Sequence, residues 1–238
     1  MDTDQAIRAR RTIRDFEPRP IDRAALDRIL EAGLRAPMHD PKDGRRFLVV
    51  DDGAVRAELA RGFWRERTSE ETAAIVDSWE VELPEQRAMF LDALPKQASM
   101  LLSAGALVIV CFRQAEPLLE AKANLHQLNA FAEVWMGLEN MLVAAAAEGI
   151  FGVTKIPSTP AETTHIRQVL GIPEDYEVSC YLALGYPAAA APTFGPELGA
   201  VDAYVFENAW GRTPPRNDSG ATRRASRREA GGTPGPVT

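Results

Sequence analysis

The sequence Ala9-Arg10-Arg11-Thr12-Ile13-Arg14-Asp15-Phe16 lies close to the N-terminus and follows on from a short helix expected over residues 3–12. It places three arginines and one hydroxyl at the helix end and in the turn after it. Arginine suits phosphate because its planar guanidinium donates paired, charge-assisted hydrogen bonds. A basic helix end that only complements the helix dipole would contain the same residues. The stretch therefore leaves two interpretations open: a phosphate-bearing ligand, or a solvated helix end.

Further along the chain, helical patterns alternate with strand-like runs. Asp22 is a good N-cap for a helix whose apolar face recurs at helical spacing until Pro37 breaks it. Residues 106–112 are continuously apolar, as expected of a central strand that is buried on both faces. Residues 124–148 give the longest helical pattern and are apolar on nearly every side. Such a helix must be buried or packed against another chain.

Two later stretches add specific order to this pattern. Gly149-Ile150-Phe151-Gly152-Val153-Thr154-Lys155-Ile156-Pro157 follows the long helix and is expected to lead into a short loop. Leu170-Gly171-Ile172-Pro173 closes a short helix, and the strand after it ends in Leu184-Gly185-Tyr186-Pro187. Together with Arg-Arg-Thr-x-Arg-x-Phe, these motifs resemble the nitroreductase-like FMN-dependent oxidoreductases over about residues 5–190.

The resemblance implies a fold and an assembly. We expect an α+β sandwich in which helices flank a central mixed or antiparallel sheet, assembled as an intertwined homodimer with FMN at each interface. Residues 1–212 would form this FMN-binding domain. Residues 213–238 contain Pro, Gly, Ser and Arg without apolar periodicity, so we expect a disordered C-terminal tail.

The resemblance also implies site residues. Arg10, Arg11 and Thr12 would hold the phosphate and ribityl chain of FMN, with help from Arg212 of a segment that crosses to the partner. Arg14 would either join them or form a structural ion pair. The residues implied to bind the cofactor are Arg10, Arg11, Thr12, Arg14, Met38, His39, Asp40, Lys96, Gln97, Val153, Thr154, Lys155 and Arg212. Lys155 and His39 are the implied catalytic residues. For both Lys96 and Lys155 the alternative is an ordinary solvated lysine.

Two segments stand out against the resemblance. Relatives often carry an Asn and a Pro-Trp pair before the first strand, whereas this chain has Lys42-Asp43-Gly44-Arg45-Arg46. That departure suggests a specialised substrate. Residues 53–92 are rich in charge, helical in pattern and longer than a simple connection needs. They are expected to form either a helical lid over the substrate side of the flavin or a peripheral helical pair that its aromatic residues anchor.

Composition excludes several classes of function. The net charge of -7 argues against a general nucleic-acid binder, because neutralising phosphates needs a basic surface. The sequence suggests no membrane-spanning run and no signal peptide. Cys111 and Cys180 sit in apolar runs and are expected to be buried free thiols in a cytoplasmic protein, with no metal site. No GxGxxG, Walker A or Ser-His-Asp pattern is present.

The implied activity is a ping-pong cycle in which NADH or NADPH reduces FMN and an electron-poor small molecule then takes the hydride. Nitro, quinone, enone and imine acceptors all suit an open flavin face. Three alternatives remain at this point. The chain could be an FMN-dependent oxidase or dehydrogenase that uses oxygen as its acceptor. It could be a flavin-binding protein without turnover, or a scaffold that has lost the flavin.

Overall fold

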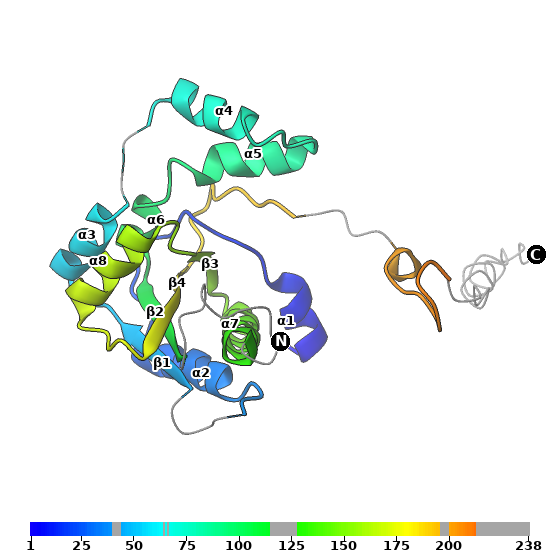
Figure 1. Cartoon of the computed structure of the whole chain (residues 1–238), viewed down its shortest axis with the longest axis horizontal. Helices are drawn as coiled ribbons and strands as arrows, with labels where there is room; N and C mark the ends of the chain where they lie inside the picture. The colour runs from blue at the N-terminus through cyan, green and yellow to red at the C-terminus, as the bar shows by residue number, and fades with distance from the viewer. Residues whose placement is uncertain (40–43, 64, 66, 115–127, 196–199, 213–238) are drawn as a thin grey trace, which may run out of the picture. The chain divides into compact units, whose positions relative to one another are not determined.

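The fold is built on a four-stranded antiparallel sheet, seen in a computed structural model that describes residues 1–39, 44–63, 65, 67–114, 128–195 and 200–212 (Figure 1). The strands in spatial order are β1 (Arg45–Val49), β2 (Ala106–Arg113), β4 (Tyr176–Gly185) and β3 (Phe151–Lys155). Every pair in this order is antiparallel, which resolves the expectation of a mixed or antiparallel sheet. The expected central strand is confirmed, because β2 is buried from Ala106 to Phe112.

Helices cover both faces of this sheet (Figure 1). The helices on one face are α3 (Gly53–Arg61), α6 (Ser99–Ser103) and α8 (Pro160–Leu170). The helices on the other face are α2 (Arg23–Leu34) and α7 (Asn129–Ala147). Alternate residues of β2 and β4 point into the two resulting cores, as the two-residue period of a strand requires. The expected α+β sandwich is therefore confirmed.

Local sequence signals explain the layer formed by α2 and α7. The Asp22 side chain accepts hydrogen bonds from the backbone N–H groups of Ala24 and Ala25, so the expected N-cap of α2 is confirmed. Close packing of α2 on α7 depends on Gly33. A Cβ added there would lie 2.6 Å from Cγ of Met141, closer than real side chains approach. The small residue therefore sets the distance between the two helices.

Residues 53–92 hold three helices that differ in their role. α3 packs on the sheet through the buried Leu59. α4 (Ser69–Asp77) and α5 (Pro84–Ala93) pack mainly against each other and stand apart from the sheet (Figure 1). An ion pair between Asp77 and Arg87 of 2.7 Å joins them, as does an edge contact between Trp79 and Phe90. The excursion that the sequence suggested over residues 53–92 is thus formed by α4 and α5, without α3.

α7 meets the length and hydropathy of a membrane span, alone among the described helices, which corrects the expectation that no such run exists. Its face with Val134, Leu138 and Met141 is buried against the sheet and α2. That packing is what a core helix needs, and it accounts for the same hydropathy. α1 (Thr3–Ala9), shorter than the expected helix over residues 3–12, packs against α7.

The chain divides into two compact units, Met1–Gly195 and Pro196–Thr238. The first contains the sheet and all the helices described above. The described part of the second contains η2 (Val201–Ala203) and a contact between the rings of Phe206 and Trp210 at 5.0 Å. The expected disordered tail, residues 213–238, lies outside the described residues.

Candidate functional site

The N-terminal motif runs in an extended course beside β3. Thr12 forms a parallel bridge with Gly152, and the backbone N–H of Ile13 donates to the Gly152 carbonyl at 3.3 Å. Phe16 then packs on Gly185, where an added Cβ would lie only 2.6 Å from the Phe16 ring. Three motifs that lie far apart in the sequence therefore meet: the arginine-rich stretch, the segment after the long helix, and Leu-Gly-Tyr-Pro.

The paired arginines of this motif point in different directions. Nε of Arg10 lies 3.1 Å from a carboxylate oxygen of Glu139 on α7, and both side chains are partly exposed. Arg11 lies over the ring of Phe151, with its guanidinium carbon 4.0 Å from the ring centroid. Nε of Arg11 is buried without a hydrogen-bond partner among the described residues. Buried donors are normally paired, so this atom is a place for an acceptor that the described residues do not supply.

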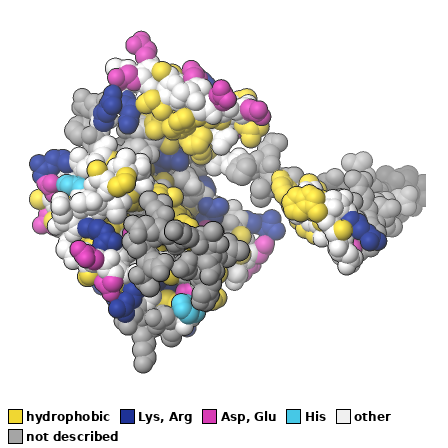
Figure 2. Space-filling view, viewed as in Figure 1, with side chains coloured by type: hydrophobic (Ala, Val, Ile, Leu, Met, Phe, Trp, Pro, Cys, Tyr) yellow, Lys and Arg dark blue, Asp and Glu magenta, His cyan; other side chains and the backbone are white. Residues whose placement is uncertain are grey.

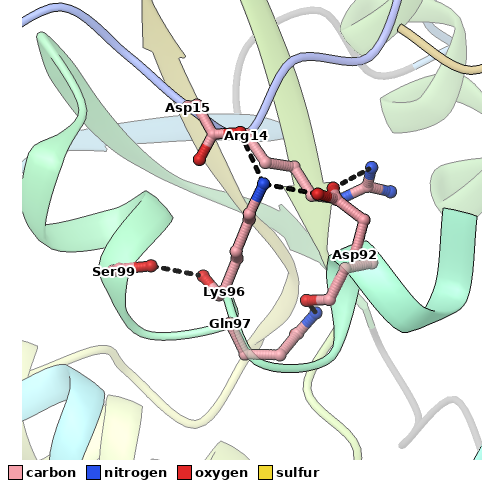
Figure 3. Close-up of polar contacts among 7 residues, drawn as sticks. Arg14, Asp15, Asp92, Lys96, Gln97 and Ser99 are labelled. Atoms are coloured by element: carbon pink, nitrogen blue, oxygen red, sulfur yellow. Dashed lines mark hydrogen bonds and ion pairs between the residues drawn. The ribbon is translucent and has the colours of Figure 1, made fainter. Parts of the chain in front are cut away.

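Arg14, Asp15, Asp92 and Lys96 form a cluster between the N-terminal segment and α5 (Figure 3). Nζ of Lys96 lies 2.5 Å from a carboxylate oxygen of Asp15 and 2.5 Å from one of Asp92. Arg14 is 4.0 Å from Asp92, which is at the limit of an ion pair. Burial lowers the pKa of Arg14, and Asp92 and Asp15 oppose that effect. Burial also opposes the charge on Lys96, but the hydrogen bonds to Asp15 and Asp92 raise its pKa overall. Lys96 is thus held as a cation.

Lys155 lies at the end of β3 and is almost fully buried, so it is neither the loop residue nor the solvated lysine that the sequence left open. Its ammonium group bonds to the carboxylate of Glu162 in the first turn of α8. The same ammonium lies 3.8 Å from the centroid of the Phe63 ring. The other oxygen of Glu162 accepts from the backbone N–H of Ser158 at 2.8 Å. Burial lowers the pKa of Lys155, and the bond to Glu162 opposes that effect.

A pocket of about 280 Å³ brings three of the predicted residues together, namely Arg14, Gln97 and Lys155. The rest of its lining comes mostly from residues 63–94: Phe63, Arg67, Trp79, Phe90, Ala93 and Leu94, with Ser158 beyond. Hydrophobic side chains gather on the α4–α5 pair, on the side facing the body of the unit (Figure 2). The pocket is therefore a cavity with aromatic walls and a polar, cationic floor.

The remaining predicted residues lie elsewhere. The backbone N–H of His39 donates to Glu133 at 3.0 Å, and its side chain is 65% exposed, outside the lining of the pocket. Sδ of Met38 accepts from Nε of Arg45. Val153 and Thr154 are within β3, paired with Ala183 and Leu182. Asp40 lies outside the described residues, and Arg212 belongs to the second unit.

Sequence reasoning missed three residues that shape the site or its frame. Glu162 occupies the last position of Thr159-Pro160-Ala161-Glu162, a helix-start pattern that says nothing of the distant Lys155. Arg67 sits among many other charged residues and gives no pattern of its own. Arg45, in the stretch that departs from the expected motif, is buried and donates to the carbonyls of Gly33, Ala36 and Pro37 at the end of α2. The changed residue thus has a structural role.

Comparison with known proteins adds to this geometry. A sequence model described as Nitroreductase family matches residues 7–186. The chain belongs to the nitroreductase family. Its N-terminal motif and long α7 helix fall within the matched range, which ends at Tyr186 of Leu-Gly-Tyr-Pro, so the resemblance read from the sequence is confirmed.

Relatives of this family member differ in their described activities. An iodotyrosine deiodinase from Haliscomenobacter hydrossis is 24% identical over 187 residues, covering 76% of this chain and 78% of its own length. A putative NADH dehydrogenase/NAD(P)H nitroreductase from Archaeoglobus fulgidus is 26% identical over 188 residues, covering 76% and 83%. Among solved structures, oxidized iodotyrosine deiodinase bound to FMN and 3-iodo-L-tyrosine superposes with a TM-score of 0.64 at 17% identity, covering 88% and 100%. That likeness shows the shared fold.

Proposed function

We propose that this nitroreductase-family chain is an FMN-dependent oxidoreductase that passes a hydride from NADH or NADPH to an electron-poor small molecule. The donor set fits FMN: cationic side chains flank the N-terminal motif, and the buried Nε of Arg11 lacks an acceptor of its own among the described residues. An FMN phosphate would supply that acceptor. The solved deiodinase that binds FMN and the relative described as an NAD(P)H nitroreductase support the same cofactor and donor.

The pocket lined by Arg14, Gln97 and Lys155 is the observation that carries this proposal. It places three residues implied to touch the cofactor around one cavity, beside the motif implied to hold its phosphate. When bound, FMN accepts a hydride from one small molecule and gives it to another, so donor and acceptor can use the cavity in turn. The remaining chemistry is positioning and electrostatics, which the side chains supply.

Each side chain has a definable task in this proposal. Arg11 and Thr12 would bind the phosphate and ribityl chain, and Arg10 would join them by leaving or sharing Glu139, which an exposed ion pair permits. Lys96 keeps a proton on Nζ between two carboxylates, so it is a fixed positive charge. Lys155 would support a reduced flavin from the end of β3 through the ammonium N–H donors that do not bond to Glu162, together with the backbone of Val153 and Thr154.

Met38, His39 and Asp40 would border the ring, and Arg212 would reach the phosphate from a partner subunit. These four roles remain predictions from the family resemblance. A homodimer belongs to the same proposal. Within the first unit, α1 leaves Ile7 exposed and α7 leaves Met136 exposed, and in the second unit Trp210 is 93% exposed. A second copy is the partner that we propose to cover these side chains. A cytoplasmic location agrees with the two buried free cysteines.

The test is the visible spectrum of the purified protein, followed by anaerobic addition of NADH and then NADPH. A flavin band that either donor bleaches, and that a nitroaromatic or quinone restores, is the expected result. A bound flavin that neither donor reduces would replace this proposal with the oxidase or the flavin-binding protein. A protein that binds no added FMN would overturn the cofactor assignment and leave a scaffold of the same fold.

A further inference from the structure

The charges around the 280 Å³ pocket are unbalanced. Three cationic side chains line it, from Arg14, Arg67 and Lys155, and no acidic side chain does so among the residues that the structure describes. A pocket that held only neutral molecules would have no need for this excess. The excess alone does not identify a ligand, so the partners of each cation decide which of them is available.

Two of the three cations already have carboxylate partners. Lys155 is bonded to Glu162, and both side chains are almost fully buried, so their charges cancel locally. Arg14 lies 4.0 Å from Asp92 in a cluster that also contains Lys96 and Asp15. Two cations and two carboxylates make that cluster neutral. Neither group therefore offers net positive charge to a ligand.

Arg67 differs from both. It lies between α3 and α4, is half-buried and has no hydrogen bond or ion pair with another residue in the described part of the chain. A guanidinium group can bind a planar anion through two parallel hydrogen bonds. Within the pocket, Arg67 is thus the cation that remains available to a ligand.

The walls of the pocket are suited to a flat ring. Phe63, Trp79 and Phe90 line it, and Trp79 and Phe90 meet edge to face with centroids 5.1 Å apart. Phe63 is held in turn against Tyr181 at 5.6 Å. Aromatic side chains bind ring compounds through offset-stacked or edge contacts. A volume of 280 Å³ lies just below the usual range for small-molecule sites, about 300–1,000 Å³, which favours a single ring.

We infer that the pocket selects a single-ring aromatic anion, with the ring among Phe63, Trp79 and Phe90 and the anionic group on Arg67. An aromatic carboxylate is the simplest member of this class. As a statement about the electron acceptor, the inference deepens the proposed function and rests on it. As a statement about binding, it depends only on the pocket.

Binding is measured by calorimetry on the protein as purified, with benzoate and benzamide as probes of equal shape and different charge. The wild-type protein binds benzoate more tightly than benzamide. R67Q weakens benzoate binding by about tenfold, the effect of losing one charge-assisted hydrogen bond, and leaves benzamide binding within about twofold. R67K keeps the charge and retains part of the preference. R65Q removes an exposed arginine that does not line the pocket, so it behaves as wild type.

Equal affinity of the wild-type protein for benzoate and benzamide would overturn the inference. Equal losses of benzoate affinity in R67Q and R65Q would also overturn it. Turnover of 4-nitrobenzoate against 4-nitrobenzamide then tests the acceptor class, with the same ordering expected for kcat/KM. The two proposals fail separately. If neither NADH nor NADPH reduces the bound flavin, the reductase proposal fails. A preference for benzoate that R67Q abolishes would still support the inference about binding.

Discussion

Lys155 and Glu162 form a buried ion pair that joins the last residue of β3 to the first turn of α8, with the Lys155 ammonium also lying over the Phe63 ring. Lys155 lines the candidate pocket, and its pairing with Glu162 connects the sheet to one of its covering helices. Any change to it therefore acts on stability and on the site together.

E162Q is expected to destabilise the protein by about 3–5 kcal/mol at neutral pH, because it leaves a buried ammonium without its counter-charge. Replacing both partners, as in K155M/E162L, recovers much of the loss. D27N is the matched control, since it breaks the exposed Arg23–Asp27 pair and costs about 1 kcal/mol or less. Urea unfolding measures all three variants, and an equal cost for E162Q and D27N would contradict the argument.

The same pair predicts a pH dependence. The folded protein lowers the pKa of Lys155 below its ordinary 10.5, so between the two values the unfolded chain binds more protons. The contribution of Lys155 to the free energy of unfolding therefore rises as the pH approaches 10.5. Loss of Glu162 lowers that pKa further. The deficit of E162Q relative to wild type should accordingly shrink between pH 7 and about pH 10. An unchanged deficit would mean that Lys155 stays charged throughout.

Phe16 and Gly185 give a third prediction, about the contact between the N-terminal motif and the Leu-Gly-Tyr-Pro motif. G185A adds a Cβ that would lie 2.6 Å from the Phe16 ring, and the ring has to move. We expect a loss of about 1–3 kcal/mol by overpacking, together with weaker FMN binding because the 10–16 segment shifts with Phe16. G53A, whose Cβ meets nothing within 4 Å, is the control and should not destabilise the protein.

The two cysteines give a fourth prediction. Both are buried and free, as the sequence suggested, and burial raises the pKa of each thiol to about 12. The thiolate is the reactive form, so native protein at pH 8 should react with Ellman's reagent at neither site. Protein in guanidinium chloride should release two equivalents, matching the two cysteines of the chain. Rapid reaction of the native protein would show that one strand opens to solvent.

Local sequence signals predicted the fold well and the site only in part. The apolar run of β2 and the Asp22 cap depend on neighbouring residues, so a single sequence suffices to find them. The contact of Phe16 with Gly185 joins residues far apart in the chain, so no local pattern predicted it. The partner of Lys155 was not predictable, because Glu162 reads as an ordinary first-turn helix residue. Arg67 was missed for a similar reason, since charge-rich stretches usually face solvent.

The departure at residues 42–46 is described only in part, because Lys42 and Asp43 lie outside the described residues. The departure suggested altered contacts with the cofactor or a specialised substrate. Within the described part of this stretch, Arg45 has a structural task, because it closes the end of α2 through three backbone carbonyls. Replacing an arginine with three such bonds lowers the free energy of unfolding, because its loss leaves buried carbonyls unpaired. A specialised substrate stays a prediction, and the α4–α5 excursion, which supplies Trp79 and Phe90 to the pocket, is a second place to look for its cause.

A last prediction concerns Arg11 and the phosphate of the proposed cofactor. R11Q removes the guanidinium whose buried Nε has no acceptor among the described residues, so an anion that it binds loses a charge-assisted partner. FMN affinity should fall by tenfold or more, since such a bond contributes about 1.5–3 kcal/mol. R8Q is the matched control, because Arg8 is exposed and paired with Asp4 within α1, and its affinity should stay at the wild-type value. Fluorescence titration of FMN into the flavin-free protein measures both. If R11Q bound FMN as tightly as R8Q did, the phosphate would have to lie elsewhere, and the unpaired Nε would be only a packing feature beside Phe151.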